Sequence, residues 1–287
     1  MSDTAQSTAR ALTSYGLSAL PQGPILVASD ASSDSNAAFP LAQMLAAHTK
    51  ADVHVMSALG PFATSMYAFD GMPMPSGGDE TSRASREAAI RQQLRNLVPS
   101  NEWPVIVRGG ESTREIVDYA ATIDARVVLT GRGHHGAVER ILGGETVLRM
   151  LQLGDRPIFA VEPGLTWLPR RALIATDLSE YSVYAARVAM SLVAPDAVVY
   201  LVNVGPVFEH TDPLLRERAV AFRDQAHQRF AQMRTLLGRP EVRFEDVLLS
   251  GNTADEIIRF AESVDADLVV SATHGYGYVR RLLLGSV

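Results

Sequence analysis

The chain repeats itself, and this repeat limits the folds open to it more than any other feature does. Residues 110–145 align without a gap onto residues 251–286, and 12 of the 36 aligned pairs are identical. Earlier in each half, Ile25–Ser32 (ILVASDAS) matches Ala172–Ser179 (ALIATDLS). Two blocks in the same order indicate two copies of one folding unit. In a chain of 287 residues, each copy is long enough to bury a core of its own.

The domain boundaries follow from where the repeat stops. Pro, Gly and Trp interrupt the pattern near residues 163–169, between the two copies. We therefore expect a first domain at 23–163 and a second at 170–287. Residues 1–22 are rich in Ser, Thr and Ala and lack the basic start and apolar stretch of a signal peptide. We expect them to form a flexible leader.

Within each half, short apolar runs alternate with helical patterns. In the first half the expected strands are Pro24–Ser29, Val53–Leu59, Pro104–Arg108, Val127–Thr130 and Pro157–Val161, and the expected helices are Ala37–Lys50, Thr81–Val98 and Thr113–Ile123, the last with Ser112 or Thr113 as its N-cap. In the second half the strands are Ala172–Thr176, Val198–Val204, Val242–Leu249 and Leu268–Ser271, and helices start at Ser182, Pro213 and Ala254. Continuous Val/Ile/Leu strands alternating with helices are typical of parallel sheets covered on both faces. The predicted fold is therefore α/β, with two tandem, doubly wound, Rossmann-like domains that pair as a pseudo-dimer.

Composition excludes several classes of function. The net charge of −6 argues against a nucleic-acid partner, which would need a basic surface. The absence of cysteine excludes disulfides, thiolate catalysis and cysteine-ligated metal sites. No apolar run reaches the length of a membrane span. We expect a cytoplasmic protein without a membrane partner.

Two segments in each half are expected at the carboxyl ends of the strands, where doubly wound sheets bind ligands. An Asp follows the first strand of each half, at Asp30 and Asp177. A glycine-containing segment follows the fourth strand, at 131–136 and 272–277, and leads to Gly144 and Gly285 respectively. Small residues allow the backbone to approach a phosphate closely, and a helix N-terminus supplies unpaired N–H groups. The pattern is typical of a phosphate-binding loop.

These residues resemble the universal stress protein family. Its hallmark is Gly-x2-Gly-x9-Gly-Ser/Thr after the fourth strand, together with an Asp after the first. The second half is similar, with Ala272-x2-Gly275-x9-Gly285-Ser286, and only the first glycine is replaced. The first half departs at two positions, with His134 in place of glycine and Glu145 in place of Ser/Thr. Family members continue past Gly-Ser into a helix and a fifth strand, whereas this sequence stops at Val287, so the second domain is expected to be cut short there.

The resemblance implies a tandem stress protein, and some members of the family bind ATP or AMP. By position, Asp177 and Val204 would frame adenine, 271–275 would lie beside ribose and phosphate, and 285–287 would hold phosphates. The resulting candidate residues are Ala175, Thr176, Asp177, Val204, Ser271, Ala272, Thr273, Gly275, Gly285, Ser286 and Val287, with weaker first-half candidates at Asp30, Gly131, His134 and Gly144. The implied cofactor is ATP or AMP, accompanied by Mg²⁺.

Each of these residues also has a simpler interpretation. Glycines after a strand commonly serve as turn residues. Asp30 and Asp177 could cap the following helix, which we favour for Asp30 but not for Asp177. Adjacent histidines at 134 and 135 usually diverge and complete no metal site here. The Met-rich segment 59–80 is long for a connector and could be a disordered excursion or a flap over a ligand or a partner.

Three functions fit the sequence. The first is a nucleotide-binding stress-response or signalling module with ATP or AMP in its second half. No nucleophile–base set and no Gly-Lys-Ser/Thr loop is present, so we expect no enzyme, or at most a very slow ATPase. The second is a nucleotide-free interaction module that presents its helices and segment 59–80 to an unidentified protein, as a monomeric pseudo-dimer or a homodimer. The third, which we favour least, is another nucleotide-binding enzyme such as an ATP pyrophosphatase or a flavoprotein subunit.

Overall fold

The computed structural model describes residues 23–60, 78–100, 102–131, 144–165, 167–177, 179–207, 213–239 and 241–272. The described residues form two compact units, one ending at Leu168 and the other beginning at Pro169. Each unit is described by itself below. None of the helices described is long and apolar enough to cross a membrane.

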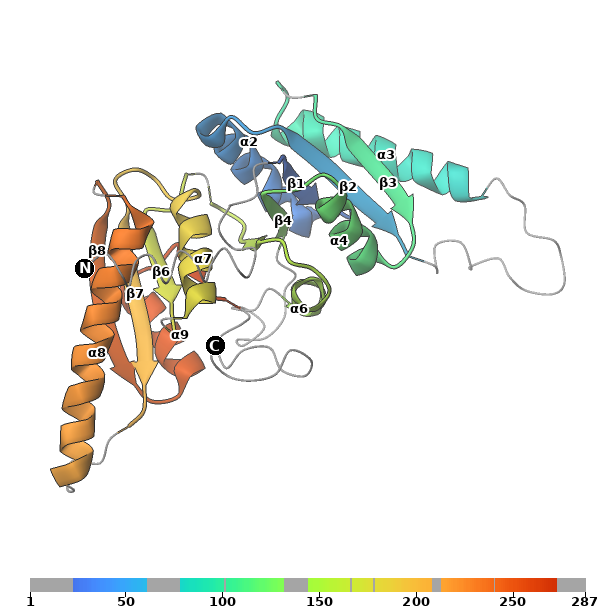
Figure 1. The fold of residues 1–287 in the computed structure, drawn as a ribbon. Coiled ribbons are helices and arrows are strands. Elements are labelled where there is room, and N and C mark those ends of the chain that lie inside the picture. The colour runs from blue at the N-terminus through green and yellow to red at the C-terminus, as the bar shows by residue number, and fades with distance from the viewer. Residues whose placement is uncertain are drawn as a thin grey trace, which may run out of the picture. The chain divides into compact units, whose positions relative to one another are not determined.

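The first unit is a parallel sheet of five strands in the order β3-β2-β1-β4-β5 (Figure 1). Helices α2 and α3 contact each other, and so do α4 and α6. The elements are β1 (Ile25–Ala28), the 3-10 helix η1 (Ser33–Ala37), α2 (Ala38–Thr49), β2 (Val53–Leu59), α3 (Gly78–Leu97), β3 (Val105–Gly109), α4 (Ser112–Thr122), β4 (Val127–Gly131), α6 (Gly144–Leu153) and β5 (Ile158–Val161).

The second unit repeats this order over its described residues, with parallel strands arranged β8-β7-β6-β9. Its elements are β6 (Arg171–Ala175), α7 (Glu180–Met190), β7 (Val198–Gly205), α8 (Pro213–Leu237), β8 (Arg243–Ser250), α9 (Thr253–Ser263) and β9 (Leu268–Val270). The predicted fold class, two tandem doubly wound α/β domains, is confirmed. The pairing of the two halves as a pseudo-dimer stays a prediction.

The repeat extends to unusual backbone conformations. Gly110 and Gly251, at equivalent positions before α4 and α9, have φ angles of 150° and 141°. Asp124 and Asp265, after the same two helices, have φ angles of 51° and 46°, a region that non-glycine residues seldom occupy. The two sequence copies therefore fold into the same local turns.

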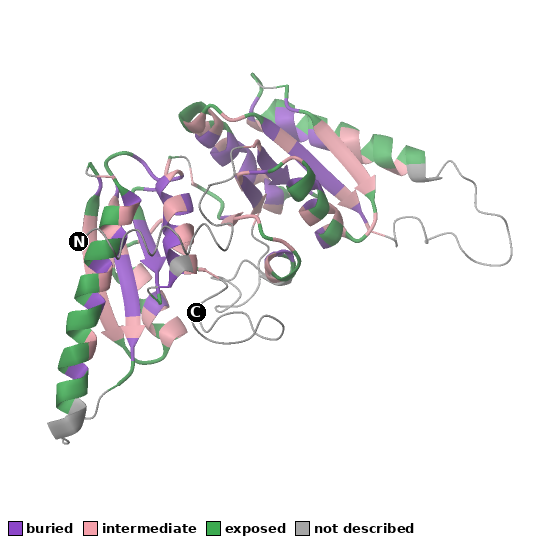
Figure 2. Ribbon diagram, viewed as in Figure 1, coloured by how far each residue is buried: buried purple, intermediate pink, exposed green. Residues whose placement is uncertain are grey.

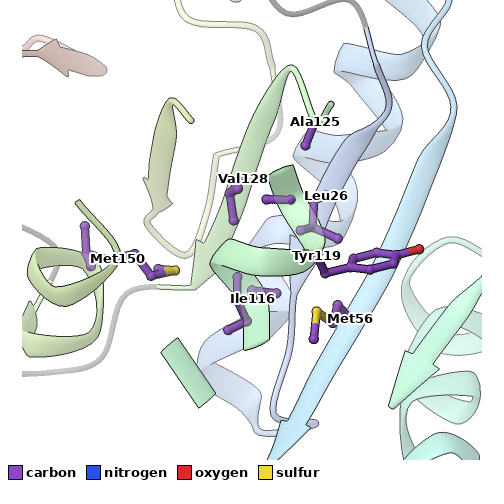
Figure 3. Close-up of a cluster of buried hydrophobic side chains, with 10 residues drawn as sticks. Leu26, Met56, Ile116, Tyr119, Ala125, Val128 and Met150 are labelled. Atoms are coloured by element: carbon purple, nitrogen blue, oxygen red, sulfur yellow. The ribbon is translucent and has the colours of Figure 1, made fainter. Parts of the chain in front are cut away.

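Buried side chains concentrate on the central strands and on the helix faces turned toward them (Figure 2). Figure 3 shows the cluster of the first unit that lies between the sheet and helices α4 and α6. Leu26 and Met56 from the sheet meet Ile116 and Tyr119 from α4, with Met150 from α6. Burial of this apolar surface is the main force that fixes α4 and α6 on the sheet.

Some boundaries differ from the sequence expectation. The N-cap of α4 is Glu111, whose carboxylate accepts hydrogen bonds from the backbone N–H groups of Thr113 and Arg114, so the prediction of Ser112 or Thr113 as the cap is wrong. A carboxylate at this position also complements the partial positive charge of the helix N-terminus. The Met-rich segment is shorter than expected, because Leu59 ends β2 and α3 already begins at Gly78.

Candidate functional site

Most of the described candidate residues of the second unit lie at one edge of its sheet. Strand β6 is paired with β7 on one side and β9 on the other, with Ala175 opposite Val202 and Ile174 opposite Val270. The strands are parallel, so the residues that follow them share the carboxyl edge. Thr176 and Asp177 follow β6 there, Ser271 and Ala272 follow β9, and Val204 lies near the end of β7.

Asp177 presents an exposed carboxylate that the chain holds in place. Its Oδ1 accepts a hydrogen bond from the backbone N–H of Ser179 at 2.9 Å and another from the Ser182 hydroxyl. Ser179 is the N-cap of α7 and accepts from the Ser182 N–H, so Asp177 itself does not cap the helix. Ser179 and Ser182 are both buried. The carboxylate is therefore fixed by a rigid helix start rather than by a loose loop.

The other described candidates of the second unit differ in exposure. Ala175 and Thr176, which precede Asp177, are buried, and Ala272 is half-buried. Val204 is half-buried and packs against the apolar cluster that β6, β7 and α9 share, so only part of it is open to a ligand. Ser271 is exposed.

Several candidates lie outside the described residues. They are Thr273, Gly275, Gly285, Ser286 and Val287 in the second unit and His134 in the first, together with the core of the Met-rich segment, 61–77. Their roles stay predictions from the sequence. Gly144 is described and is the first residue of α6, as the phosphate-loop pattern requires.

Asn203 is a polar residue at this edge that the sequence analysis did not single out. It lies in β7, is 8% exposed, and donates a hydrogen bond from Nδ2 to the carbonyl of Thr176 at 2.7 Å. The available signal was a lone amide in the apolar run Val198–Gly205. A buried polar residue inside such a strand needs a specific reason.

In the first unit the matching carboxylate is Asp30. Its Oδ1 accepts from both the backbone N–H and the hydroxyl of Ser32, at 2.9 and 2.6 Å. Partial desolvation raises the pKa of Asp30, but these hydrogen bonds and the nearby Arg86 charge outweigh it, so the pKa lies below its ordinary value. The N-cap of the following helix η1 is Ser32, so the expectation that Asp30 caps a helix is wrong.

Behind Asp30, the first unit fills its sheet edge with a buried polar network. Gln93 of α3 accepts from the Ser29 hydroxyl at 2.9 Å and donates to the Ser32 carbonyl, to Ser35 Oγ and to Asn36 Oδ1. Ser29 and Ser35 are also hydrogen-bonded to each other at 2.9 Å. Counted back from the helix ends at Leu97 and Leu237, the residue that matches Gln93 in α8 is buried Met233. The network thus belongs to the first unit alone.

Gly131, a first-half candidate at the end of β4, is needed by the chain's own packing. A Cβ built at this residue would lie 1.9 Å from the Asp34 carbonyl oxygen of η1. The equivalent residue in the second unit is Ala272, which has a Cβ. Helix η1 therefore sits against the end of β4 at a distance that only glycine permits.

The described residues at these edges offer hydrogen-bonding groups. Among the residues that the structure describes, no group of three or more His, Asp or Glu side chains could hold a metal ion. The second-unit edge offers a fixed carboxylate, a serine hydroxyl and backbone groups at strand ends. Such groups can hydrogen-bond a polar ligand.

Comparison with known proteins agrees with the fold. A model of the Universal stress protein family matches residues 23–162 and 169–287. A universal stress protein of Methanocaldococcus jannaschii is 30% identical over 128 residues, which are 42% of this chain and 74% of that protein. The crystal structure of a universal stress protein from Archaeoglobus fulgidus superposes with a TM-score of 0.60 at 14% identity, covering 90% of both chains. The crystal structure of a protein from Pseudomonas aeruginosa described as a "Putative Universal Stress Protein" gives a TM-score of 0.54 at 14% identity, covering 94% of this chain and 87% of that one.

Proposed function

The chain belongs to the universal stress protein family, and on that premise we propose that it is a regulatory module that binds ATP or AMP in its second unit and hydrolyses it slowly or not at all. The observation that supports this most is the exposed Asp177 carboxylate, held by Ser179 and Ser182 at the carboxyl edge of a parallel sheet. A group that is fixed before binding loses little entropy when a ligand arrives. This edge is also where doubly wound sheets bind nucleotides.

In this proposal Asp177 and Val204 frame the adenine, and residues 271–275 lie beside the ribose and phosphates. Residues 285–287 hold the phosphates through backbone N–H groups and the Ser286 hydroxyl. Mg²⁺ would enter with the triphosphate. These assignments take their support from the sequence motif and from the shared strand edge.

The first unit is proposed to bind nucleotide weakly or not at all. Its sheet edge is filled by the hydrogen-bond network around Gln93, and the backbone of η1 lies directly against Gly131. Its motif also carries Glu145 where a hydroxyl would meet phosphate, which places like charges together and removes a donor. Nucleotide should therefore discriminate strongly between the two units.

Slow or absent hydrolysis follows from the groups available. Phosphoryl transfer needs neutralisation of charge at the γ-phosphate and a positioned attacking group. Backbone donors bind the ground state and the transition state almost alike, which gives affinity without rate. We expect turnover far below the enzyme median of about 10 per second. A radiolabelled ATP assay with Mg²⁺ measures it, and turnover at ordinary enzyme rates would contradict the proposal.

The binding claim is tested by mass spectrometry of ligand released from freshly purified protein, followed by titration calorimetry with ATP and AMP. Asp177→Asn should weaken binding about tenfold or more, whereas the matched variant Asp30→Asn should leave it unchanged. Gly275→Asp against Gly136→Asp repeats the comparison at the phosphate loops. Loss of binding only in the first-unit variants would place the nucleotide site in the first unit instead. No binding by the wild type would overturn the proposal in favour of a nucleotide-free interaction module.

A further inference from the structure

Asn203 holds the piece of backbone that leads into Asp177. Its Nδ2 donates to the Thr176 carbonyl oxygen at 2.7 Å, and this carbonyl belongs to the peptide that joins Thr176 to Asp177. The sheet ladder reaches the Thr176 N–H, which donates to the Val202 carbonyl at 2.8 Å, and Asn203 holds the carbonyl that follows it. The Asn203 amide therefore sets the direction in which the backbone leaves the sheet.

Fold stability alone does not account for an asparagine at this position. Among the described residues, Asn203 Oδ1 is a buried oxygen with no hydrogen-bond partner. An unpaired buried acceptor costs stability, which offsets part of what the Nδ2 hydrogen bond contributes. Buried polar groups without partners are more frequent at functional sites, where activity requires residues that do not maximise stability.

The first unit holds the same turn by a different residue and one residue later, at the carbonyl of Asp30, which matches Asp177. By strand register, Ala28 is opposite Met56 and Ala175 is opposite Val202, so the residue that matches Asn203 is Ser57. There the guanidinium of Arg86, from α3, donates to the Asp30 carbonyl and, at 3.4 Å, to Ser57 Oγ.

The helix residue that matches Arg86 in the second unit is buried Ala226, counted back from the ends of α3 and α8. In the first unit the Arg86 guanidinium, from α3, thus holds the Asp30 carbonyl. In the second unit the Asn203 amide, from β7, holds the Thr176 carbonyl. At this helix position the second unit therefore has a methyl group in place of the arginine side chain.

We propose that Asn203 is a positioning residue of the nucleotide site: it orients the Thr176–Asp177 peptide so that the Asp177 carboxylate meets the ligand. This inference rests on the proposed function. It assigns to Asn203 an effect on affinity that acts through Asp177, without contact to the nucleotide. A residue with a purely structural role would instead lower affinity even in a variant that already lacks the Asp177 carboxylate.

Two variants separate these roles. Asn203→Asp keeps the shape of the side chain but replaces the donor with an acceptor beside the Thr176 carbonyl. Asn203→Leu removes the donor and the unpaired acceptor together. Titration calorimetry with ATP should show affinity reduced about tenfold or more in both variants, at a temperature where urea unfolding shows that each is fully folded. Ser57→Ala, at the matching position of the first unit, should leave ATP affinity unchanged.

A double-mutant cycle tests whether Asn203 acts through Asp177. If it does, adding Asn203→Leu to Asp177→Asn should cause little further loss of affinity. Additive losses would overturn the inference, as would wild-type affinity in Asn203→Leu. A wild-type protein that binds neither ATP nor AMP would overturn the proposed function as well, whereas unchanged variants of a nucleotide-binding wild type would overturn this inference alone.

Discussion

Replacing Gly131 with alanine should destabilise the first unit selectively. The new Cβ would lie 1.9 Å from the Asp34 carbonyl oxygen, 2.5 Å from its carbon and 2.6 Å from the Ser35 Cα. All three are backbone atoms, so no side chain can rotate away. Carbon atoms pack at about 3.5 Å or more, so η1 would have to retreat by about 1.5 Å.

The size of the effect follows from what that retreat disturbs. Overpacking a tight site costs about 1–3 kcal/mol by itself. Moving η1 also stretches the hydrogen bonds that join Ser35 and Asn36 to Gln93, each contributing about 1 kcal/mol. We expect a total loss of about 3 kcal/mol, which at a urea m-value of about 2 kcal/mol/M lowers the midpoint by about 1.5 M.

Tryptophan fluorescence during urea unfolding is the assay, because both tryptophans precede residue 169. Trp103 is buried and stacks on Phe39 with ring centroids 6.4 Å apart, so its emission reports the fold of the first unit. Gly60→Ala is the matched control, since a Cβ there meets nothing within 4 Å. An unchanged midpoint for Gly131→Ala, or an equal fall for Gly60→Ala, would refute the packing argument.

Two further predictions concern single side chains. The backbone N–H of Arg114, followed by that of Thr113, lowers the pKa of Glu111, so the carboxylate stabilises the fold above its ordinary pKa and loses this effect as pH falls through the lowered value. The stability difference between wild type and Glu111→Gln, measured by urea unfolding from pH 7 to pH 3, should therefore shrink toward acid. A difference that grows toward acid would contradict the cap. A Cβ at Gly205 would lie 2.4 Å from the Phe222 ring, so Gly205→Ala should lower the free energy of unfolding by about 1–3 kcal/mol, measured by thermal unfolding. Adding Phe222→Leu should restore part of this loss. No restoration would show that the ring is not the obstacle.

The architecture could be predicted from the sequence because it depends on patterns that repeat. Apolar runs at matching places in both halves identify the strands, and the structure places them in two parallel sheets. Strand bounds agree to within one or two residues, as for Val53–Leu59. The carboxyl edge of the sheet then follows from strand direction alone, and with it the neighbourhood of Asp177.

The polar details could not be predicted, because they depend on contacts between residues distant in sequence. Gln93 lies in a charged helical stretch, where it resembles a solvated surface residue, yet it is buried against Ser29 and Ser35. Helix η1 was missed because Ser-Asp-Ser-Asn carries no apolar periodicity. Asn203 was missed because nothing in one strand shows which carbonyl its amide will reach.

The Gln93 network has a consequence for how the whole chain would respond to nucleotide. A unit whose sheet edge is completed by its own side chains has the same stability with or without ligand, whereas a unit that binds ligand gains RT ln(1 + [L]/Kd). In a single melting experiment, the unfolding transition of the first unit then serves as an internal reference for that of the second. The difference between the two midpoint temperatures of one molecule would report nucleotide occupancy without any added probe.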